Sequence, residues 1–107
     1  MPVTHTFTAN ATIAAGQQDS ETITCDFAEL IAVQFPASMT GSTVTLYAET
    51  PSGTGKLVCD PSGTPITVPV VTSAQVLTPL GIRCKTITLH SDAVENADRT
   101  LGLVFQE

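Results

Sequence analysis

The sequence predicts an all-β protein, an antiparallel β-sandwich or jelly roll of about eight strands in a single domain spanning residues 1–107. Apolar and polar residues alternate with a period of two along most of the chain, which is typical of strands buried on one face. Turn signals built from Gly, Pro and Ser separate these stretches at intervals of roughly ten residues, as in sandwiches and jelly rolls. The length of 107 residues is that of one such domain.

The N-terminal strand is predicted over residues 3–8, where Val3, His5 and Phe7 share one face. Residues 10–14 are expected to continue this strand after a bulge.

Residues 21–50 are predicted to form three strands in succession, around which the rest of the chain is organised. Pro36 ends the second strand because it has no N–H to donate, and Gly41 permits the turn into the third. The inward side chains are predicted to be Ile23, Cys25 and Phe27, then Ile31, Val33 and Phe35, then Val44, Leu46 and Ala48.

The second half of the chain is predicted to consist of shorter strands between tight turns. Pro69 places its strand at a sheet edge, because proline has no N–H to donate to a neighbouring strand. The expected elements are a turn at 51–56, strands at 57–59, 66–71, 75–77, 82–90 and 101–105, and a polar loop at 92–99, the only stretch with helical potential.

The composition points to a surface that lies against another protein. Charged residues make up 13% of the chain, roughly half the usual share, and Thr takes their place. A free domain usually relies on interspersed charge to stay dispersed and to protect its sheet edges. The alternative is that a Thr-rich sheet is soluble enough alone. With only 5% aromatic residues, the bulky core residues are expected to be Phe7, Phe27, Phe35 and Phe105.

The net charge of −6 argues against a nucleic-acid or an anionic membrane surface as partner. No apolar run reaches the length of about 20 residues that a membrane span needs. The first ten residues lack the features of a secretion signal, so a protein made in the cytoplasm is expected.

Cys25, Cys59 and Cys84 are widely spaced and carry no CxxC or Cys/His pattern, so a zinc site is not expected. Three buried, reduced thiols are the favoured interpretation, and a disulfide between two of them is the alternative.

No catalytic residues, cofactor or metal site are predicted, and the chain is not expected to be an enzyme. His5 and His90 are far apart in the sequence, with no nucleophile or orienting partner evident for either. The GTGK stretch at 53–56 lacks the first glycine and the Ser or Thr of a phosphate loop. Tyr47 is the only Tyr and there is no Trp, so Tyr47 is expected to serve a sheet surface or an interface rather than to stack a sugar.

The loop from Asp92 to Asp98 brings together Asp92, Glu95, Asn96 and Asp98, oxygen ligands of the kind that calcium uses. Their spacing lacks the pattern of a calcium loop, so a solvated loop is the favoured interpretation and calcium binding the alternative.

The order of turns and strands resembles a family of small bacteriophage virion proteins, the capsid decoration or cement type, from Ala11 onward. Relatives share a Gly and Ser opening, a strand ending in a Pro-Ala turn, a Gly-started hairpin and a closing strand that begins with Arg. The matching positions are Gly16 and Ser20, 33–37, 44–46, 63–68, 87–91 and 99–104.

This resemblance implies a jelly roll on the capsid exterior of the virion, with no enzymatic activity. Its expected partners are the major capsid protein and copies of itself, most often in a homotrimer. The alternative function is a receptor- or glycan-binding module of a phage tail or fibre.

Overall fold

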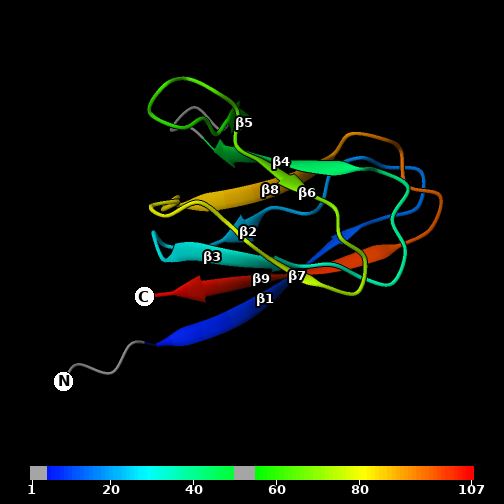
Figure 1. Cartoon of the computed structure of the whole chain (residues 1–107), viewed down its shortest axis with the longest axis horizontal. Helices are drawn as coiled ribbons and strands as arrows, with labels where there is room; N and C mark the ends of the chain where they lie inside the picture. Colours follow the sequence, from blue (N-terminus) through cyan, green and yellow to red (C-terminus); the bar gives the residue numbers. More distant parts are fainter. Residues whose placement is uncertain (1–4, 50–54) are drawn as a thin grey trace.

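The computed structural model describes residues 5–49 and 55–107, which form two antiparallel sheets packed face to face (Figure 1). This described part contains strands, turns and loops but no helix. The strands are β1 (Thr6–Ile13), β2 (Ile23–Thr24), β3 (Glu29–Gln34), β4 (Thr43–Glu49), β5 (Gly55–Leu57), β6 (Thr67–Pro69), β7 (Gln75–Leu77), β8 (Thr86–Ser91) and β9 (Arg99–Gln106).

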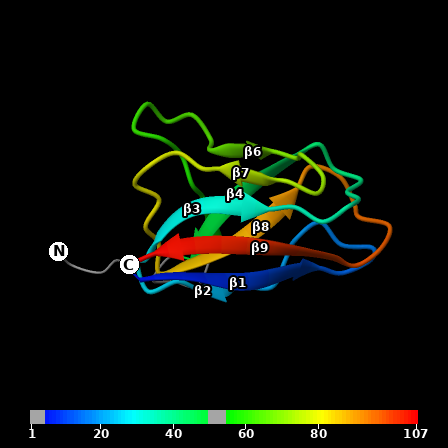
Figure 2. The ribbon, with the colours of Figure 1, turned by 60° about the horizontal axis from the view of Figure 1, so that its bottom comes forward.

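The sheet order is that of a jelly roll. One sheet has the order β1-β9-β3-β7, which Figure 2 shows from bottom to top. The other has the order β2-β8-β4-β5, and β6 pairs with β4 beyond β5 along the same edge. The first four strands alternate between the two sheets, so each sheet combines segments from both halves of the chain. The predicted all-β fold class is confirmed.

The core between the sheets is built from aliphatic residues, as expected for a chain poor in aromatic residues. Phe105 is the largest fully buried side chain, and the other large ones are Leu, Ile and Val. Residues that alternate along β4, β8 and β9 supply most of this layer. They include Val44, Leu46, Ile87, Leu89, Leu101 and Leu103, each fully buried.

The predicted bulge in the first strand is wrong, because β1 pairs with β9 without interruption from Thr6 to Ile13. The bulge lies instead in β3, between Leu30 and Ala32. It turns Leu30 inward and leaves Ile31 half-buried, so the predicted inward position of Ile31 is also wrong. Residues 3–4 of the predicted strand lie outside the described residues.

The strand predicted to reach Phe27 ends early. β2 covers two residues, and the chain then turns at 25–28, where Ala28 N donates to Cys25 O at 3.0 Å. Phe27 is 58% exposed, so its predicted place in the core is wrong. Phe7 is also partly exposed, whereas Phe35 and Phe105 are buried as predicted.

The predicted strand at 82–90 is likewise shorter, because only its second half forms β8. Residues 82–85 pair irregularly with the 25–30 segment through backbone hydrogen bonds such as Leu30 N to Ile82 O at 2.9 Å. The strands around 44–48, 75–77 and 101–105 are confirmed, and β6 lies at the sheet edge as Pro69 predicts. Of the turn predicted at 51–56, residues 51–54 lie outside the described part, whereas Gly55 and Lys56 belong to β5. The strand predicted at 57–59 is therefore wrong in its bounds, because β5 begins two residues earlier and ends at Leu57.

Candidate functional site

The outer face of the β1-β9-β3-β7 sheet is the first candidate site. Odd-numbered residues of β1 and β9 such as Ile13 and Leu103 are buried, so the even-numbered ones point outward. Antiparallel pairing sets Thr8 opposite Val104 and Thr12 opposite Thr100. We call this surface the neutral face; it comprises Thr6, Thr8, Asn10, Thr12, Gln34, Gln75, Leu77, Thr100, Gly102, Val104 and Gln106.

Polar groups of the neutral face satisfy one another across the strands. The hydroxyl oxygens of Thr12 and Thr100 lie 3.0 Å apart, and Gln34 Nε2 donates to Gln75 Oε1 at 3.0 Å. The Gln34 side chain lies over Gly102, where a Cβ atom would come within 2.6 Å of its amide oxygen. Glycine at this position lets the Gln34 side chain lie flat across β9, and no residue of the neutral face carries a charge.

The free edge of β1 adjoins this face. Glu107 N donates to the carbonyl of His5 at 2.9 Å. Thr12 N points away from β9 and donates to the Glu21 carboxylate at 3.0 Å. By the alternation of an antiparallel ladder, Thr6, Thr8 and Asn10 direct their N–H and C=O groups away from β9. Such an edge is a template for pairing with another chain.

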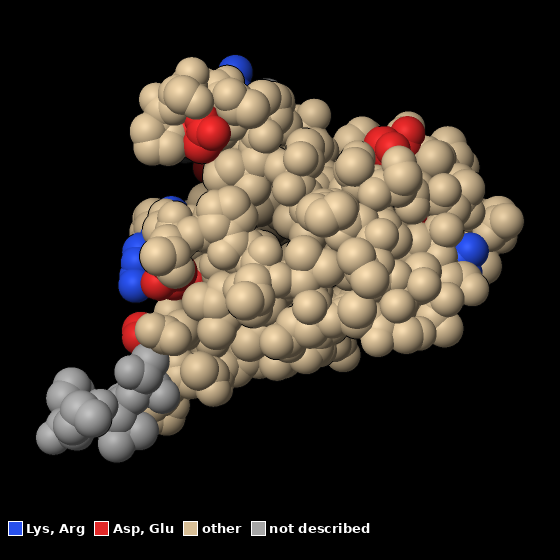
Figure 3. All heavy atoms as spheres, viewed as in Figure 1, with Lys and Arg blue, Asp and Glu red and all other residues tan. Residues whose placement is uncertain are grey.

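Charged side chains gather at the ends and loops of the sandwich. On the face shown in Figure 3, the Lys, Arg, Asp and Glu atoms lie around the periphery and leave the middle uncharged. Glu29 marks one end of the neutral face, where its carboxylate lies 3.4 Å from the Arg83 guanidinium. The few charged residues therefore leave the middle of this face uncharged.

The second candidate site is a depression of about 370 Å³ on the outer face of the other sheet. We call it the Tyr47 depression. His90 Nδ1 lies 2.6 Å from Asp19 Oδ1, and the His90 ring meets the Tyr47 ring edge-on, with centroids 5.7 Å apart at 73°. Its lining residues are Asp19, Tyr47, Gly55, Thr88 and His90.

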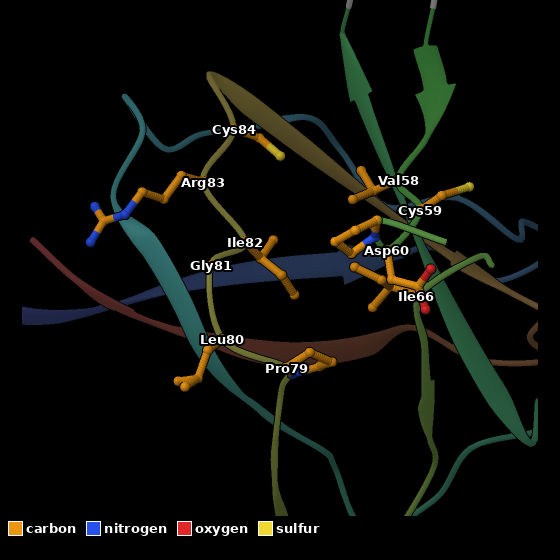
Figure 4. A pocket seen from close by; sticks show the side chains of 11 residues that line it. Val58, Cys59, Asp60, Ile66, Pro79, Leu80, Gly81, Ile82, Arg83 and Cys84 are labelled. Carbon is orange, nitrogen blue, oxygen red and sulfur yellow. The ribbon is translucent and has the colours of Figure 1, made fainter. Parts of the chain in front are cut away.

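A groove of about 490 Å³ contains two of the three cysteines (Figure 4). Cys59 and Cys84 come from opposite walls, Cys59 from the segment that leads to β6 and Cys84 from the segment before β8. All three cysteines are free, and Cys25 and Cys84 are at least partly buried. Cys59 is exposed, so the prediction of three buried thiols is wrong at that position.

Burial shifts the pKa of two of the thiols. It raises the pKa of Cys25 to about 11 and also raises the pKa of Cys84. A raised pKa disfavours the thiolate, which is the form that acts as nucleophile and metal ligand. In the groove, burial therefore disfavours the thiolate of Cys84.

The loop from Asp92 to Asp98 is built around a buried carboxylate, so its interpretation as a merely solvated loop is wrong. Glu95 is fully buried. Its carboxylate accepts hydrogen bonds from Thr40 N (2.8 Å), Gly41 N (2.9 Å), Ser91 Oγ (2.9 Å) and Arg99 Nε (3.0 Å). Burial alone would raise the pKa of Glu95, but these hydrogen bonds outweigh it and lower the pKa. We call these five residues the Glu95 cluster.

The remaining oxygen groups of this loop also bond to protein. Asp92 accepts from the backbone N and the hydroxyl of Ser42, both at 2.7 Å, and these bonds lower its pKa. Asp98 accepts from Ala15 N at 2.8 Å, and Asn96 accepts from Arg99 at 2.7 Å. Among the described residues, no three His, Cys, Asp or Glu side chains gather in a metal-binding arrangement. The described part of the chain also holds no helix suited to crossing a membrane.

Comparison with known proteins identifies the fold but no family. No protein-family profile matches the chain, and no curated protein matches it. Among solved structures, the chain is similar to the SPBc2 prophage-derived protein YomS. The TM-score is 0.62 at 14% sequence identity, and the match covers 100% of this chain and 97% of the other. At this identity the similarity establishes a shared all-β architecture over the whole length.

Proposed function

We propose that this chain is a bacteriophage virion structural protein, a capsid decoration (cement) protein that binds and stabilises the assembled coat lattice. The observation that carries this proposal is the neutral face, a broad sheet surface without charged groups beside a free strand edge. The similarity in fold to a prophage-derived protein supports a phage origin.

The neutral face suits burial because its desolvation cost is low. Thr12 with Thr100, and Gln34 with Gln75, already satisfy each other, so covering them strands few polar groups. Covering Lys or Glu side chains would cost far more unless each charge found a partner. A stable interface buries about 1,600 Å² in total, counted over both partners. A four-stranded sheet face together with its free edge can supply a large part of this chain's share.

The proposed partners are the major capsid protein and copies of this chain, in a homotrimer on the capsid exterior. Binding to the assembled lattice but not to dissociated subunits stabilises the lattice by mass action. Many symmetric copies make a modest contact at each site cumulative. No catalytic step is part of this proposal.

The test is co-sedimentation of the purified protein with expanded empty capsids. Thr8→Lys and Val104→Lys each place a charge on the neutral face, at positions that face each other across β1 and β9. Each should weaken capsid binding about tenfold, since an unpaired lysine in the contact costs at least about 1.4 kcal/mol.

The matched control is Thr67→Lys, an exposed threonine on β6 of the other sheet. It should bind capsids like the unaltered protein. Equal binding by all three variants would show that the neutral face is not the contact, and a protein that stays in the supernatant would refute the decoration role.

A further inference from the structure

We propose that the Tyr47 depression is a binding site for a neutral saccharide, displayed on the sheet opposite the neutral face. This site goes beyond capsid binding, because contact with a coat lattice through β1 and β9 requires nothing of β4 and β8.

The depression lies on the outer side of the β2-β8-β4 sheet. Tyr47 and Thr88 are direct cross-strand partners and form its floor. A smaller hollow lined by Thr22 and Glu49 continues it and shares Tyr47, Gly55 and Thr88. Its volume of about 370 Å³ falls within the range of small-molecule sites, about 300 to 1,000 Å³.

The Tyr47 ring is held in place before any ligand arrives. Asp19 and His90 are bridged through their backbones as well as through the 2.6 Å side-chain contact. His90 in turn packs against Tyr47 at a centroid distance of 5.7 Å. An aromatic ring oriented in this way offers an apolar face without the entropy loss of ordering a mobile side chain.

Gly55 keeps the Tyr47 ring accessible. Gly55 pairs with Glu49 beside the tyrosine, and a Cβ atom at this position would lie 3.8 Å from Tyr47 Cβ and 4.0 Å from Cδ1. A larger side chain would therefore reach over the ring without clashing with the backbone. Glycine is the residue that leaves this space to a ligand.

The polar groups around the ring define the class of ligand. Asp19 and Glu49 provide carboxylate acceptors, and Thr22 and Thr88 provide hydroxyls that lie 3.0 Å apart. Neither hollow is lined by Lys or Arg, and the His90 ring already contacts Asp19, so an anionic sugar would meet the Glu49 carboxylate without a Lys or Arg partner. An uncharged ring with several hydroxyls can stack on Tyr47 and donate to the carboxylates. A neutral pyranose has this chemistry.

The test is ligand-observed and ¹H–¹⁵N NMR with the neutral methyl glycosides of glucose, galactose and mannose, and with glucuronic acid as the anionic comparison. At least one neutral glycoside should bind with a Kd of about 1 mM, the strength expected for a single stacked ring. Shift changes should centre on Tyr47, Thr88 and His90, and glucuronic acid should bind at least about tenfold more weakly.

Two variants separate recognition from folding. Tyr47→Ala removes the platform, and Gly55→Leu covers it while leaving the tyrosine in place. Both should lose saccharide binding and keep the fold, judged by the dispersion of the amide spectrum, and Thr67→Lys should bind sugar normally. Absence of binding by all the neutral glycosides at about ten times the expected Kd, or sugar binding that survives Gly55→Leu, would overturn the proposal.

The capsid test stays independent of this one. Tyr47→Ala and Gly55→Leu should co-sediment with capsids like the unaltered protein, because neither residue lies on the neutral face. Failure of the saccharide site would therefore leave the proposed capsid contact standing, and the reverse also holds.

Discussion

The two ends of the sandwich treat charge and backbone strain in opposite ways. At one end the Glu95 cluster buries a carboxylate and satisfies it completely. At the other end the turn at 25–28 exposes a phenylalanine on a strained backbone. The same two strands join these ends, because β3 and β8 both run from the turn at 25–28 toward the Glu95 cluster (Figure 1).

The Glu95 cluster ties three loops together. Glu95 receives donors from the 40–41 segment, from the end of β8 and from the start of β9. Its own backbone N donates to Gln17 O at 2.9 Å, and Gly16 N donates to its carbonyl at 2.8 Å. A buried carboxylate with four donors holds the loops in one arrangement, because any other leaves a charge without partners.

The turn at 25–28 places two non-glycine residues in the left-handed region, of which Phe27 is the less favourable. Asp26 has φ 47° and Phe27 has φ 63°, both in the left-handed region that suits Asn and Gly. Backbone bonds to Lys85 O and Cys84 O, and the Arg83 guanidinium donating to Phe27 O at 3.1 Å, hold this conformation. The Asp26–Lys85 pair at 2.6 Å is exposed and adds little.

The two ends of the sandwich tolerate substitutions differently. One end depends on the buried Glu95 carboxylate, whose replacement alone would leave the Arg99 guanidinium without its partner. The other end depends on backbone hydrogen bonds that survive the loss of the side chains they display. The effects of mutations on the free energy of unfolding should therefore differ between the two ends in size and even in sign.

The largest effect is expected for Glu95→Gln. Replacing the carboxylate leaves Arg99 without its buried partner and sets an amide against donors, so the free energy of unfolding at pH 7 should fall by about 3–5 kcal/mol. Urea denaturation measures this directly. Exposed Glu49→Gln is the matched control and should stay within about 0.5 kcal/mol of the unaltered protein.

Comparing the unaltered protein with Glu95→Gln also gives the pH dependence of the stability that Glu95 provides. Because the pKa of folded Glu95 is lowered from its ordinary 4.5, its stabilisation is present above that value and is lost as pH falls through the folded pKa. The gap in stability between the unaltered protein and Glu95→Gln should therefore narrow in acid. A gap that is small at pH 7, or that widens in acid, would contradict the role given to the cluster.

An intermediate loss is expected for Gly41→Ala. A Cβ atom there would clash with Ser91 Oγ and lie 2.6 Å from Asp92 Oδ1, so the cluster must open. The expected cost is about 1–3 kcal/mol by thermal or urea unfolding. Gly55→Ala meets only ordinary contacts and serves as the control. A similar stability for both alanine variants would mean that the packing around Gly41 is loose.

The smallest effect is expected for Phe27→Gly. The substitution relieves about 1–2 kcal/mol of left-handed strain, which offsets the lost contacts of a half-exposed ring, so stability should stay within about 1 kcal/mol or rise slightly. Truncating the fully buried Phe105 to Ala should cost about 3–5 kcal/mol by contrast. A loss above about 2 kcal/mol for Phe27→Gly would show that the turn depends on its phenylalanine.

Much of the fold could be predicted from the sequence because period-2 alternation is local. The strands at 44–48 and 101–105 show clear alternation and, like the short strand at 75–77, are bounded by Gly, Pro or polar residues. The number and spacing of such strands predict a sandwich or jelly roll but not which strands pair.

The errors have local and non-local causes. The turn at 25–28 carries neither Gly nor Asn, and Asp26 alone is a weak turn signal within a stretch of alternating residues. The bulge at Ile31 shifts the inward set by one residue and leaves no signature in a uniformly apolar stretch.

The two site features missed are products of tertiary pairing. Glu95 is buried by donors from Thr40 and Gly41, more than fifty residues away, and reads from sequence as one more loop acid. The Tyr47 depression requires the β4–β8 register, which places Tyr47 opposite Thr88 and brings His90 beside it. The alternation of Thr with Tyr47 on β4 and with His90 on β8 is visible in the sequence. The register that sets these two strands side by side is not.

The most direct test of the proposed capsid contact is a density map of the virions of a phage that encodes this chain. The proposal predicts a jelly roll on the capsid exterior, with β1 and the neutral face against coat subunits and the Tyr47 depression facing outward. A particle without this chain, or one in which the neutral face lies open to solvent, would contradict it.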